Sequence, residues 1–258
     1  MSSCSPSVAP STTSADREPR ARAAHAPGGR PLVGVLALQG GFEAHERVLE
    51  RLGASVREVR VVADLDGLDG LVIPGGESTT MTLGIEREGL AGPLRELIGA
   101  TGAGGGGPMG GGGPMGDGGL TGGGCRTGGI PVLASCAGLI MLDREHLGAM
   151  DIRAERNAFG RQIRSFEADV DVRGLDGGPL RGIFIRAPWI AEHGPRVEII
   201  GELDGHPVAA REGRMLAVSF HSELGDDDRL HRLFLELVAD ALAAAAQRGR
   251  GGRGDRRW

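Results

Sequence analysis

The sequence predicts an α/β protein, a three-layer single domain whose central, mostly parallel sheet is flanked by helices. The apolar run Leu32–Leu38 has the continuous hydrophobicity of a strand that is buried on both faces. The amphipathic segment Glu43–Leu52 follows it, and Gly53 is suited to end that helix. Such alternation of apolar runs and amphipathic segments is typical of a parallel sheet covered by helices. The 258 residues, 40% of them hydrophobic, suffice for a sizeable core.

The same patterns predict the remaining elements. A helical segment, Leu139–Glu145, follows one short strand, and a final helix is expected over Asp228–Ala246, where apolar residues recur at helical spacing. The further expected strands are Val56–Val62, Leu71–Ile73, Ile130–Ala134, Arg164–Val172, Gly182–Ile185, Val197–Leu203, Val208–Arg211 and Met215–Phe220.

Composition divides the chain into one domain and three segments expected to lack a core. Residues 31–246 form the predicted domain, and residues 1–30 are expected to be a disordered extension without the apolar centre of a secretory signal. Residues from about 99 to 129 are dominated by glycine and contain GGGGPM twice, so we expect a flexible surface insertion. Residues 247–258 are expected to be a disordered Arg/Gly tail.

Charge and residue usage exclude several classes of function. The net charge of −5 gives no basis for a nucleic-acid partner, and no apolar run approaches the roughly 20 residues that span a membrane. The sequence contains no lysine, which rules out a Schiff-base or phosphate-loop lysine. Cys4, Cys125 and Cys136 have neither zinc spacing nor a disulfide framework, which favours a reducing, cytoplasmic location.

Cys136 lies at the predicted junction of a buried strand and a helix. A cysteine on such a turn faces the amide groups of the helix, which favour a thiolate. The small residues Ala137 and Gly138 let a substrate approach closely, as in a nucleophile elbow. A cysteine among apolar residues is also a common inert core residue, so this feature alone leaves both readings open.

His221 and Glu223 lie two residues apart at the end of the last predicted strand. Residues at this spacing project to the same side, so the carboxylate can orient the imidazole. Cysteine, histidine and an acid together support thiolate attack on an acyl group and proton delivery to the departing amine. A solvated polar strand end is the alternative explanation.

Gly75-Gly76-Glu77-Ser78 follows another predicted strand. Two glycines at this point expose backbone N–H groups that can bind a developing negative charge, although an ordinary glycine turn has the same sequence. This turn, Cys136 and the His221/Glu223 pair all fall at carboxyl ends of predicted strands, where open α/β sheets bind ligands. We therefore expect one catalytic site at this edge.

At these residues the chain resembles the class I (triad-type) glutamine amidotransferases, a flavodoxin-like group, and within them the glutaminase subunits of pyridoxal 5′-phosphate synthase. The turn PGGEST and the segment ERNAFGRQIRSFE are the most specific matches, whereas a cysteine elbow with His-x-Glu is common to the whole class. The matching segments are Val33–His45, Leu71–Met81, Ser135–Ile140, Glu155–Glu167, Ile183–Pro188 and Ser219–Leu224.

The resemblance implies a catalytic triad of Cys136, His221 and Glu223. It implies hydrolysis of L-glutamine without a cofactor or metal, and transfer of ammonia through a hetero-oligomeric complex to a synthase subunit that builds vitamin B6. The stretch Gln39–His45 is a candidate for sensing that partner. An oxyanion hole is implied at the Gly76 and Ala137 amides, and the implied glutamine-binding residues are Gly76, Glu77, Ser78, Arg156, Ile185 and Arg186.

Three features depart from the family pattern. Ser222 stands where proline is usual between the histidine and the glutamate, and Ser135 replaces the commoner glycine or alanine before the nucleophile. The glycine insertion precedes the catalytic strand, at the end opposite Cys136, so we expect the site to survive it. Two alternatives remain: an amidotransferase that serves another acceptor, and a catalytically impaired regulatory subunit.

Overall fold

The computed structural model describes residues 29–99, 129–159 and 165–251. Its centre is a seven-stranded sheet with the order β2-β1-β3-β4-β11-β10-β9. Neighbouring strands run parallel from β2 to β11, and only the pairs β11–β10 and β10–β9 are antiparallel. The strands are β1 (Leu32–Leu36), β2 (Ser55–Val59), β3 (Gly70–Ile73), β4 (Val132–Ser135), β9 (Glu198–Leu203), β10 (His206–Glu212) and β11 (Met215–Val218).

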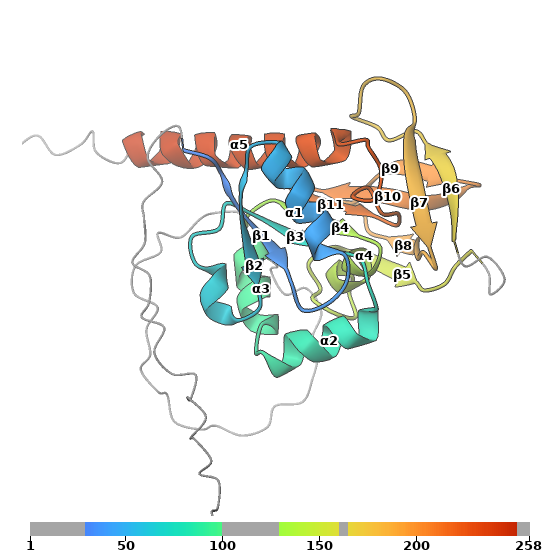
Figure 1. The fold of residues 1–258 in the computed structure, drawn as a ribbon, viewed down its shortest axis with the longest axis horizontal. Coiled ribbons are helices and arrows are strands. Elements are labelled where there is room, and N and C mark those ends of the chain that lie inside the picture. Colours follow the sequence, from blue (N-terminus) through green and yellow to red (C-terminus); the bar gives the residue numbers. More distant parts are fainter. Residues whose placement is uncertain (1–28, 100–128, 160–164, 252–258) are drawn as a thin grey trace, which may run out of the picture.

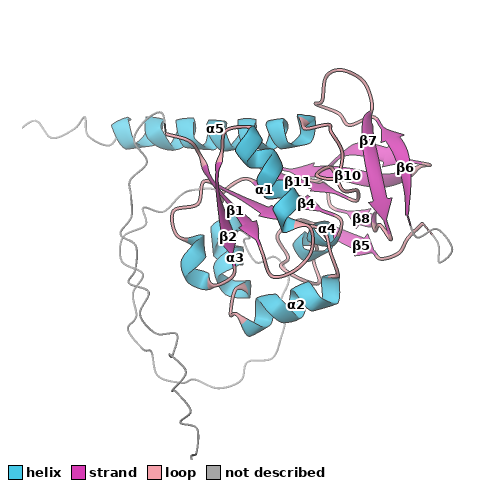
Figure 2. Cartoon of the chain, viewed as in Figure 1, coloured by secondary structure: helices cyan, strands magenta, loops and turns pink. Residues whose placement is uncertain are grey.

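Helices cover both faces of this sheet, so the predicted three-layer arrangement is confirmed (Figures 1 and 2). One face carries α1 and α5, and the other carries α2, α3, α4 and the 3₁₀ helix η1. The bounds are α1 (Phe42–Arg51), η1 (Val62–Leu65), α2 (Ser78–Arg87), α3 (Ala91–Ile98), α4 (Ala137–Leu142) and α5 (Arg229–Gly251).

The core consists of two apolar layers, one on each side of the sheet. In β3, Leu71 and Ile73 belong to the layer under α2, α3 and α4, whereas Val72 belongs to the layer under α1 and α5. Successive side chains of a strand point to opposite faces, so a central strand of this sheet must be apolar throughout. This requirement explains the unbroken hydrophobic runs in the sequence.

Two antiparallel pairs of strands adjoin one end of the main sheet (Figure 1). They pair β5 (Ile152–Glu155) with β8 (Trp189–His193), and β6 (Ser165–Val170) with β7 (Leu180–Ile185). A bridge between Ile183 and His221 joins the second pair to the segment that follows β11. The β6–β7 hairpin therefore reaches the edge where the site was predicted.

Most predicted strands and the helix α1 are confirmed, with ends that differ by a few residues. The helices α2, α3 and η1 and the strands β5 and β8 were not predicted from the sequence. The predicted start of the tail at residue 247 was wrong, because α5 continues to Gly251. The predictions for residues 1–28, 100–128 and 252–258, including Cys4 and Cys125, lie outside the described residues.

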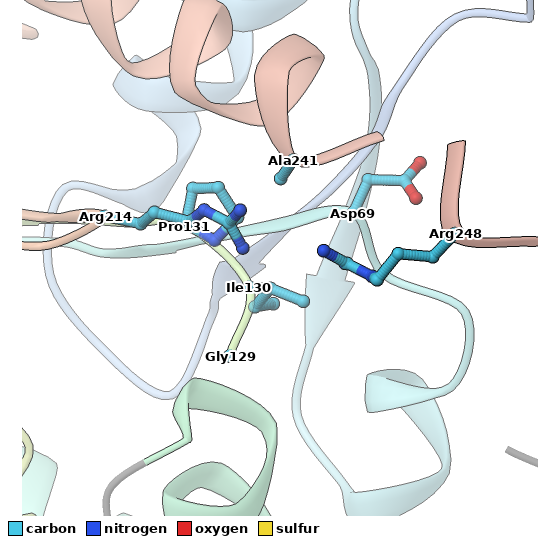
Figure 3. A pocket seen from close by; sticks show the side chains of 7 residues that line it. All are labelled: Asp69, Gly129, Ile130, Pro131, Arg214, Ala241 and Arg248. Atoms are coloured by element: carbon cyan, nitrogen blue, oxygen red, sulfur yellow. The ribbon is translucent and has the colours of Figure 1, made fainter. Parts of the chain in front are cut away.

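The two ends of the glycine insertion meet at the amino edge of the sheet. The Ile130 amide donates a hydrogen bond of 3.0 Å to the Leu97 carbonyl, so the chain returns beside the end of α3. A small cavity of about 10 Å³ lies on the same edge, next to Gly129 and Pro131 (Figure 3). Such a volume holds about one water molecule. The insertion therefore begins and ends away from the carboxyl edge that carries Cys136.

Candidate active site

Cys136 occupies a strained turn between β4 and α4. Its backbone has φ 49° and ψ −107°, a conformation that side-chain-bearing residues rarely adopt and that is concentrated at functional sites. The Cys136 amide donates a 2.8 Å hydrogen bond to the Val218 carbonyl, which anchors the turn to β11. Gly138 has no space for a side chain, since a Cβ there would collide with the Ile73 carbonyl. The strand–turn–helix geometry of a nucleophile elbow is therefore present, and the nucleophilic role of Cys136 stays a prediction.

His221 and Glu223 form the predicted pair. The His221 Nδ1 atom lies 2.7 Å from Glu223 Oε1, and both side chains are buried. The backbone holds the histidine from the opposite side, because the His221 amide donates a 2.8 Å hydrogen bond to the Ile183 carbonyl. The carboxylate thus fixes the ring orientation, as the spacing predicted.

Gly75 shows how closely the cysteine and histidine approach one another. A Cβ placed on Gly75 would lie 3.1 Å from Cys136 Cβ and 2.9 Å from His221 Nδ1, and would collide with His221 Cε1. The absence of a side chain at this position therefore lets the thiol-bearing turn and the imidazole share one space. Three distant segments of the chain, which contain residues 75, 136 and 221, meet here.

The two triad partners of the thiol have shifted acidities. Burial disfavours the charged imidazole, but hydrogen bonds to Cys136 and Glu223 outweigh it and raise the pKa of His221 from 6.5 to about 10. Burial would raise the pKa of Glu223, but the facing rings of His45 and His221 lower it from 4.5 to about 2. At neutral pH the pair is therefore an imidazolium held by a carboxylate.

A second histidine, His45 of α1, lies behind the triad. Its Nε2 atom is 3.3 Å from Glu223 Oε2 and 3.0 Å from Ser135 Oγ, and its Nδ1 atom is 2.9 Å from Nε2 of His231. Both histidines are completely buried. Neither residue was predicted to belong to the site, although each is a buried histidine on an amphipathic helix.

The turn after β3 lies beside the triad. Gly76 has φ 155°, and a side chain there would collide with Gln39, whose Nε2 donates a 2.9 Å hydrogen bond to the Glu77 carbonyl. The Gly41 amide donates to the Gly75 carbonyl at 3.2 Å. The stretch predicted to sense a partner, Gln39–His45, therefore contacts both the turn and the back of the triad.

Glu77 acts as the N-cap of α2. Its carboxylate accepts hydrogen bonds from the Thr79 and Thr80 amides and from the Thr80 hydroxyl. The two bonds from Thr80 and that from the Thr79 amide lower the pKa of Glu77 from 4.5 to about 2. Ser78, the first residue of α2, is buried, whereas Glu77 is exposed and charged.

The remaining predicted binding residues lie on two other segments. The Ile185 carbonyl, at the end of β7, is 3.8 Å from Cys136 Sγ, and Arg186 follows it with an unusual φ of 45°. The Ile185 carbonyl is therefore beside the Cys136 thiol, and Arg186 is the next residue along the chain. Arg156 follows β5, and its Nη2 atom is 3.1 Å from Nε2 of His146, which in turn contacts Asp143 at 2.7 Å.

The geometry supports covalent chemistry by a thiol. Among residues 29–99, 129–159 and 165–251, no group of three histidine, cysteine, aspartate or glutamate side chains is arranged to hold a metal ion. In the same ranges, no helix has both the length and the apolar character needed to cross a membrane. A cysteine, a histidine and a glutamate at the carboxyl edge of a mostly parallel sheet are the arrangement typical of triad-type cysteine hydrolases.

Comparison with known proteins identifies the family. The sequence matches the SNO glutamine amidotransferase family over residues 35–104 and 125–240, and the chain belongs to this family. It is 44% identical over 227 residues to the pyridoxal 5′-phosphate synthase subunit PdxT of Acidothermus cellulolyticus, covering 83% of this chain and 96% of that protein. The PdxT subunit of Geobacillus thermodenitrificans is 44% identical over 221 residues, which cover 83% and 98% of the two chains.

A solved structure has the same fold. The crystal structure of a glutamine amidotransferase, 39% identical in sequence, superposes with a TM-score of 0.65 over 80% of this chain and 98% of that one. The predicted class I amidotransferase fold is thereby confirmed.

Proposed function

We propose that this chain is the glutaminase subunit of a pyridoxal 5′-phosphate synthase. It hydrolyses L-glutamine to L-glutamate and ammonia, and a synthase subunit receives the ammonia. The observation that carries this proposal is the placement of His221, whose Nδ1 atom lies 2.7 Å from Glu223 Oε1 and whose ring meets Cys136 at Gly75. Thiol-based amide hydrolysis needs a cysteine, a histidine and an acid in this order. The relatives that bear the PdxT name match this chain over more than nine tenths of their own length, which supports the choice of acceptor.

The reaction begins with attack of the Cys136 thiolate on the side-chain carboxamide of glutamine. A tetrahedral intermediate forms, and its oxyanion receives hydrogen bonds from the Gly76 and Ala137 amides. The first amide lies on the turn after β3 and the second begins α4, so both come from backbone fixed by secondary structure. Removal of one such donor typically slows a reaction by about 10²- to 10³-fold.

His221 then moves the protons. The imidazolium gives its proton to the amide nitrogen, ammonia leaves, and a glutamyl thioester remains on Cys136. The neutral imidazole takes a proton from an attacking water, and collapse of the second tetrahedral intermediate releases glutamate and the thiolate. Glu223 keeps the ring orientation through both steps by its 2.7 Å hydrogen bond to Nδ1.

Glutamine itself would be held at the rim of this site. Arg156 is suited to the α-carboxylate and the exposed, ionised Glu77 to the α-ammonium, although its carboxylate also caps α2. Gly76 and Ser78 supply the adjoining turn. Ile185, whose carbonyl lies 3.8 Å from Cys136 Sγ, and the following residue Arg186 would contact the carboxamide end of the substrate.

The partner and location follow from the same chemistry. Direct transfer keeps ammonia from escaping into solvent, so we expect a hetero-oligomeric complex and a low glutaminase rate without the synthase subunit. A reduced nucleophilic thiol at Cys136 is compatible with a reducing, cytoplasmic location.

Ammonia release from glutamine tests the proposal. It should be slow for the isolated chain, several-fold faster with the cognate synthase, and abolished in Cys136→Ser. Equal rates with and without the synthase would argue for a different acceptor, and a pull-down would then identify that subunit. Full activity of Cys136→Ser would refute the proposed nucleophile.

A further inference from the structure

The triad carboxylate has one oxygen that the triad itself does not use. Glu223 Oε1 contacts His221, whereas the buried Oε2 has no hydrogen-bond partner among the described residues. The Nε2 atom of His45 lies 3.3 Å from Oε2, close enough for an electrostatic contact but not aligned for a hydrogen bond. Burial of a carboxylate oxygen without a hydrogen bond costs free energy, so the position of His45 beside Glu223 Oε2 is significant.

The contacts of His45 determine which of its nitrogens carries the proton. A proton on Nε2 faces the carboxylate and the Ser135 oxygen, whereas a lone pair there would be repelled by Glu223. Nδ1 must then accept from the Nε2–H group of His231 at 2.9 Å. This leaves Nδ1 of His231 unprotonated, which agrees with its lack of a hydrogen-bond partner among the described residues.

Both rings are uncharged in this arrangement. Burial lowers the pKa of His45, and the charge of His221 adds to that lowering although Glu223 opposes it. Burial and the neighbouring His45 lower the pKa of His231 to about 3. Each ring therefore carries one N–H group. The N–H of His231 on α5 points to His45 on α1, and the N–H of His45 points to the Glu223 carboxylate. Figure 1 shows these two helices on one side of the sheet.

We propose that His45 is a positioning residue of the triad, whose Nε2–H group stabilises Oε2 of Glu223 and prevents this carboxylate from rotating away from His221. His231 fixes the tautomer of His45, and Ser135 Oγ holds the ring in plane. The helix α1 supplies a rigid support, because Ala44, Val48 and Leu49 bury the same face of it. His45 does not touch the substrate.

The kinetic part of the test rests on the proposed glutaminase function, and a second measurement does not. Glutamine hydrolysis is measured with the cognate synthase for wild type, His45→Leu and His45→Gln. Alkylation of Cys136 by iodoacetamide is measured against pH in a Cys4→Ser/Cys125→Ser background, so that only this thiol reacts. His193→Leu and His193→Gln are the matched controls, since His193 is exposed on β8.

We expect His45→Leu to lower kcat by about 10- to 100-fold while KM changes by less than about threefold. Its alkylation profile should move to higher pH, because a loosely held carboxylate supports the imidazolium less well. His45→Gln retains an N–H donor near the Nε2 position and should recover most of both losses. The His193 variants should match wild type.

A folded His45→Leu variant with unchanged kcat and an unchanged alkylation profile would overturn the proposal, as would His45→Gln behaving like His45→Leu. If His45→Leu does not fold, His231→Leu replaces it: a shift in the same direction supports the proposal, and wild-type behaviour contradicts it. If the wild type does not hydrolyse glutamine but the His45 variants show the expected shifts in alkylation, the proposed function alone is refuted.

Discussion

A methyl group at Gly75 should disable the site without disturbing the fold. The position is buried, and its backbone is not in the left-handed region that favours glycine, so Gly75→Ala adds steric volume without backbone strain. The added Cβ would lie 2.9 Å from His221 Nδ1 and 3.1 Å from Cys136 Cβ. Contacts between carbon atoms are favourable at about 3.5–4.0 Å, so the imidazole has to retreat by roughly 1 Å.

That displacement sets the size of the effect. A shift of about 1 Å in a catalytic group costs about 10²-fold in rate, or roughly 2.7 kcal/mol in the activation free energy. It also weakens the 2.7 Å contact between His221 Nδ1 and Glu223 Oε1. We expect kcat for glutamine hydrolysis to fall about 100-fold or more, and overpacking to reduce the free energy of unfolding by about 1–3 kcal/mol.

The assay is steady-state ammonia release with the synthase present, beside urea unfolding of the isolated chain. Gly92→Ala is the matched control, because a Cβ at Gly92 in α3 meets nothing within 4 Å. It should keep wild-type activity and gain up to about 1 kcal/mol of stability. A Gly75→Ala variant that turns over glutamine at more than half of the wild-type rate would show that Cys136 and His221 do not share this space.

Three further predictions concern stability, pH and the insertion. Ser222→Ala removes a buried hydroxyl that has no hydrogen-bond partner among the described residues, so it should raise the free energy of unfolding by about 1 kcal/mol in urea titrations. The control is Ser165→Ala at an exposed position, which should change the free energy of unfolding by less than about 0.5 kcal/mol. The pKa of Glu223 is lowered from 4.5 to about 2, so this carboxylate stabilises the fold above pH 4.5 and loses its contribution as the pH falls toward 2. The pKa of His221 is raised from 6.5 to about 10, so this imidazolium stabilises the fold below pH 6.5 and loses its contribution as the pH rises through 10. The melting temperature of wild type relative to His221→Ala/Glu223→Ala should therefore be highest between pH 4.5 and 6.5, and a gap that does not change with pH would contradict these assignments. Replacing residues 100–128 by two glycines should preserve the melting temperature and the glutaminase rate, because Ile130 and Leu97 already meet across the gap; loss of folding would show that the insertion supports the domain.

The sequence predicted the parts of the structure that depend on neighbouring residues. The strand before α1 was evident from one apolar run, and the His221/Glu223 pair from the two-residue period of an extended chain. Cys136 was placed correctly because a strand and a helix meet at that residue. Each of these signals is local, so spacing alone was sufficient.

The missed helices carry weak or misleading local signals. In α2, threonines and Gly84 reduce helix propensity, and the cap is a glutamate, which is not among the residues usually preferred at that position. In α3, Gly92 and Pro93 indicate a break in the sequence, although proline is tolerated in the first turn of a helix. Packing against the sheet overrides both signals.

The contact between His45 and His231 illustrates a different obstacle. The two residues are 186 positions apart, and only the folding of α1 and α5 over the same face brings them together. A histidine within an apolar helical stripe was the available hint, but periodicity gives no information about its partner. Long-range polar contacts of this kind therefore required the structure.

The glutamyl thioester on Cys136 offers the most direct test of the triad. The chain is mixed with its synthase and glutamine, quenched in acid within the first turnovers, digested and examined by mass spectrometry. We predict a glutamyl thioester on the peptide that contains Cys136 in the wild type, and none on that peptide in Cys136→Ser. An adduct on a different residue, or glutamine hydrolysis that persists in Cys136→Ser, would contradict the account.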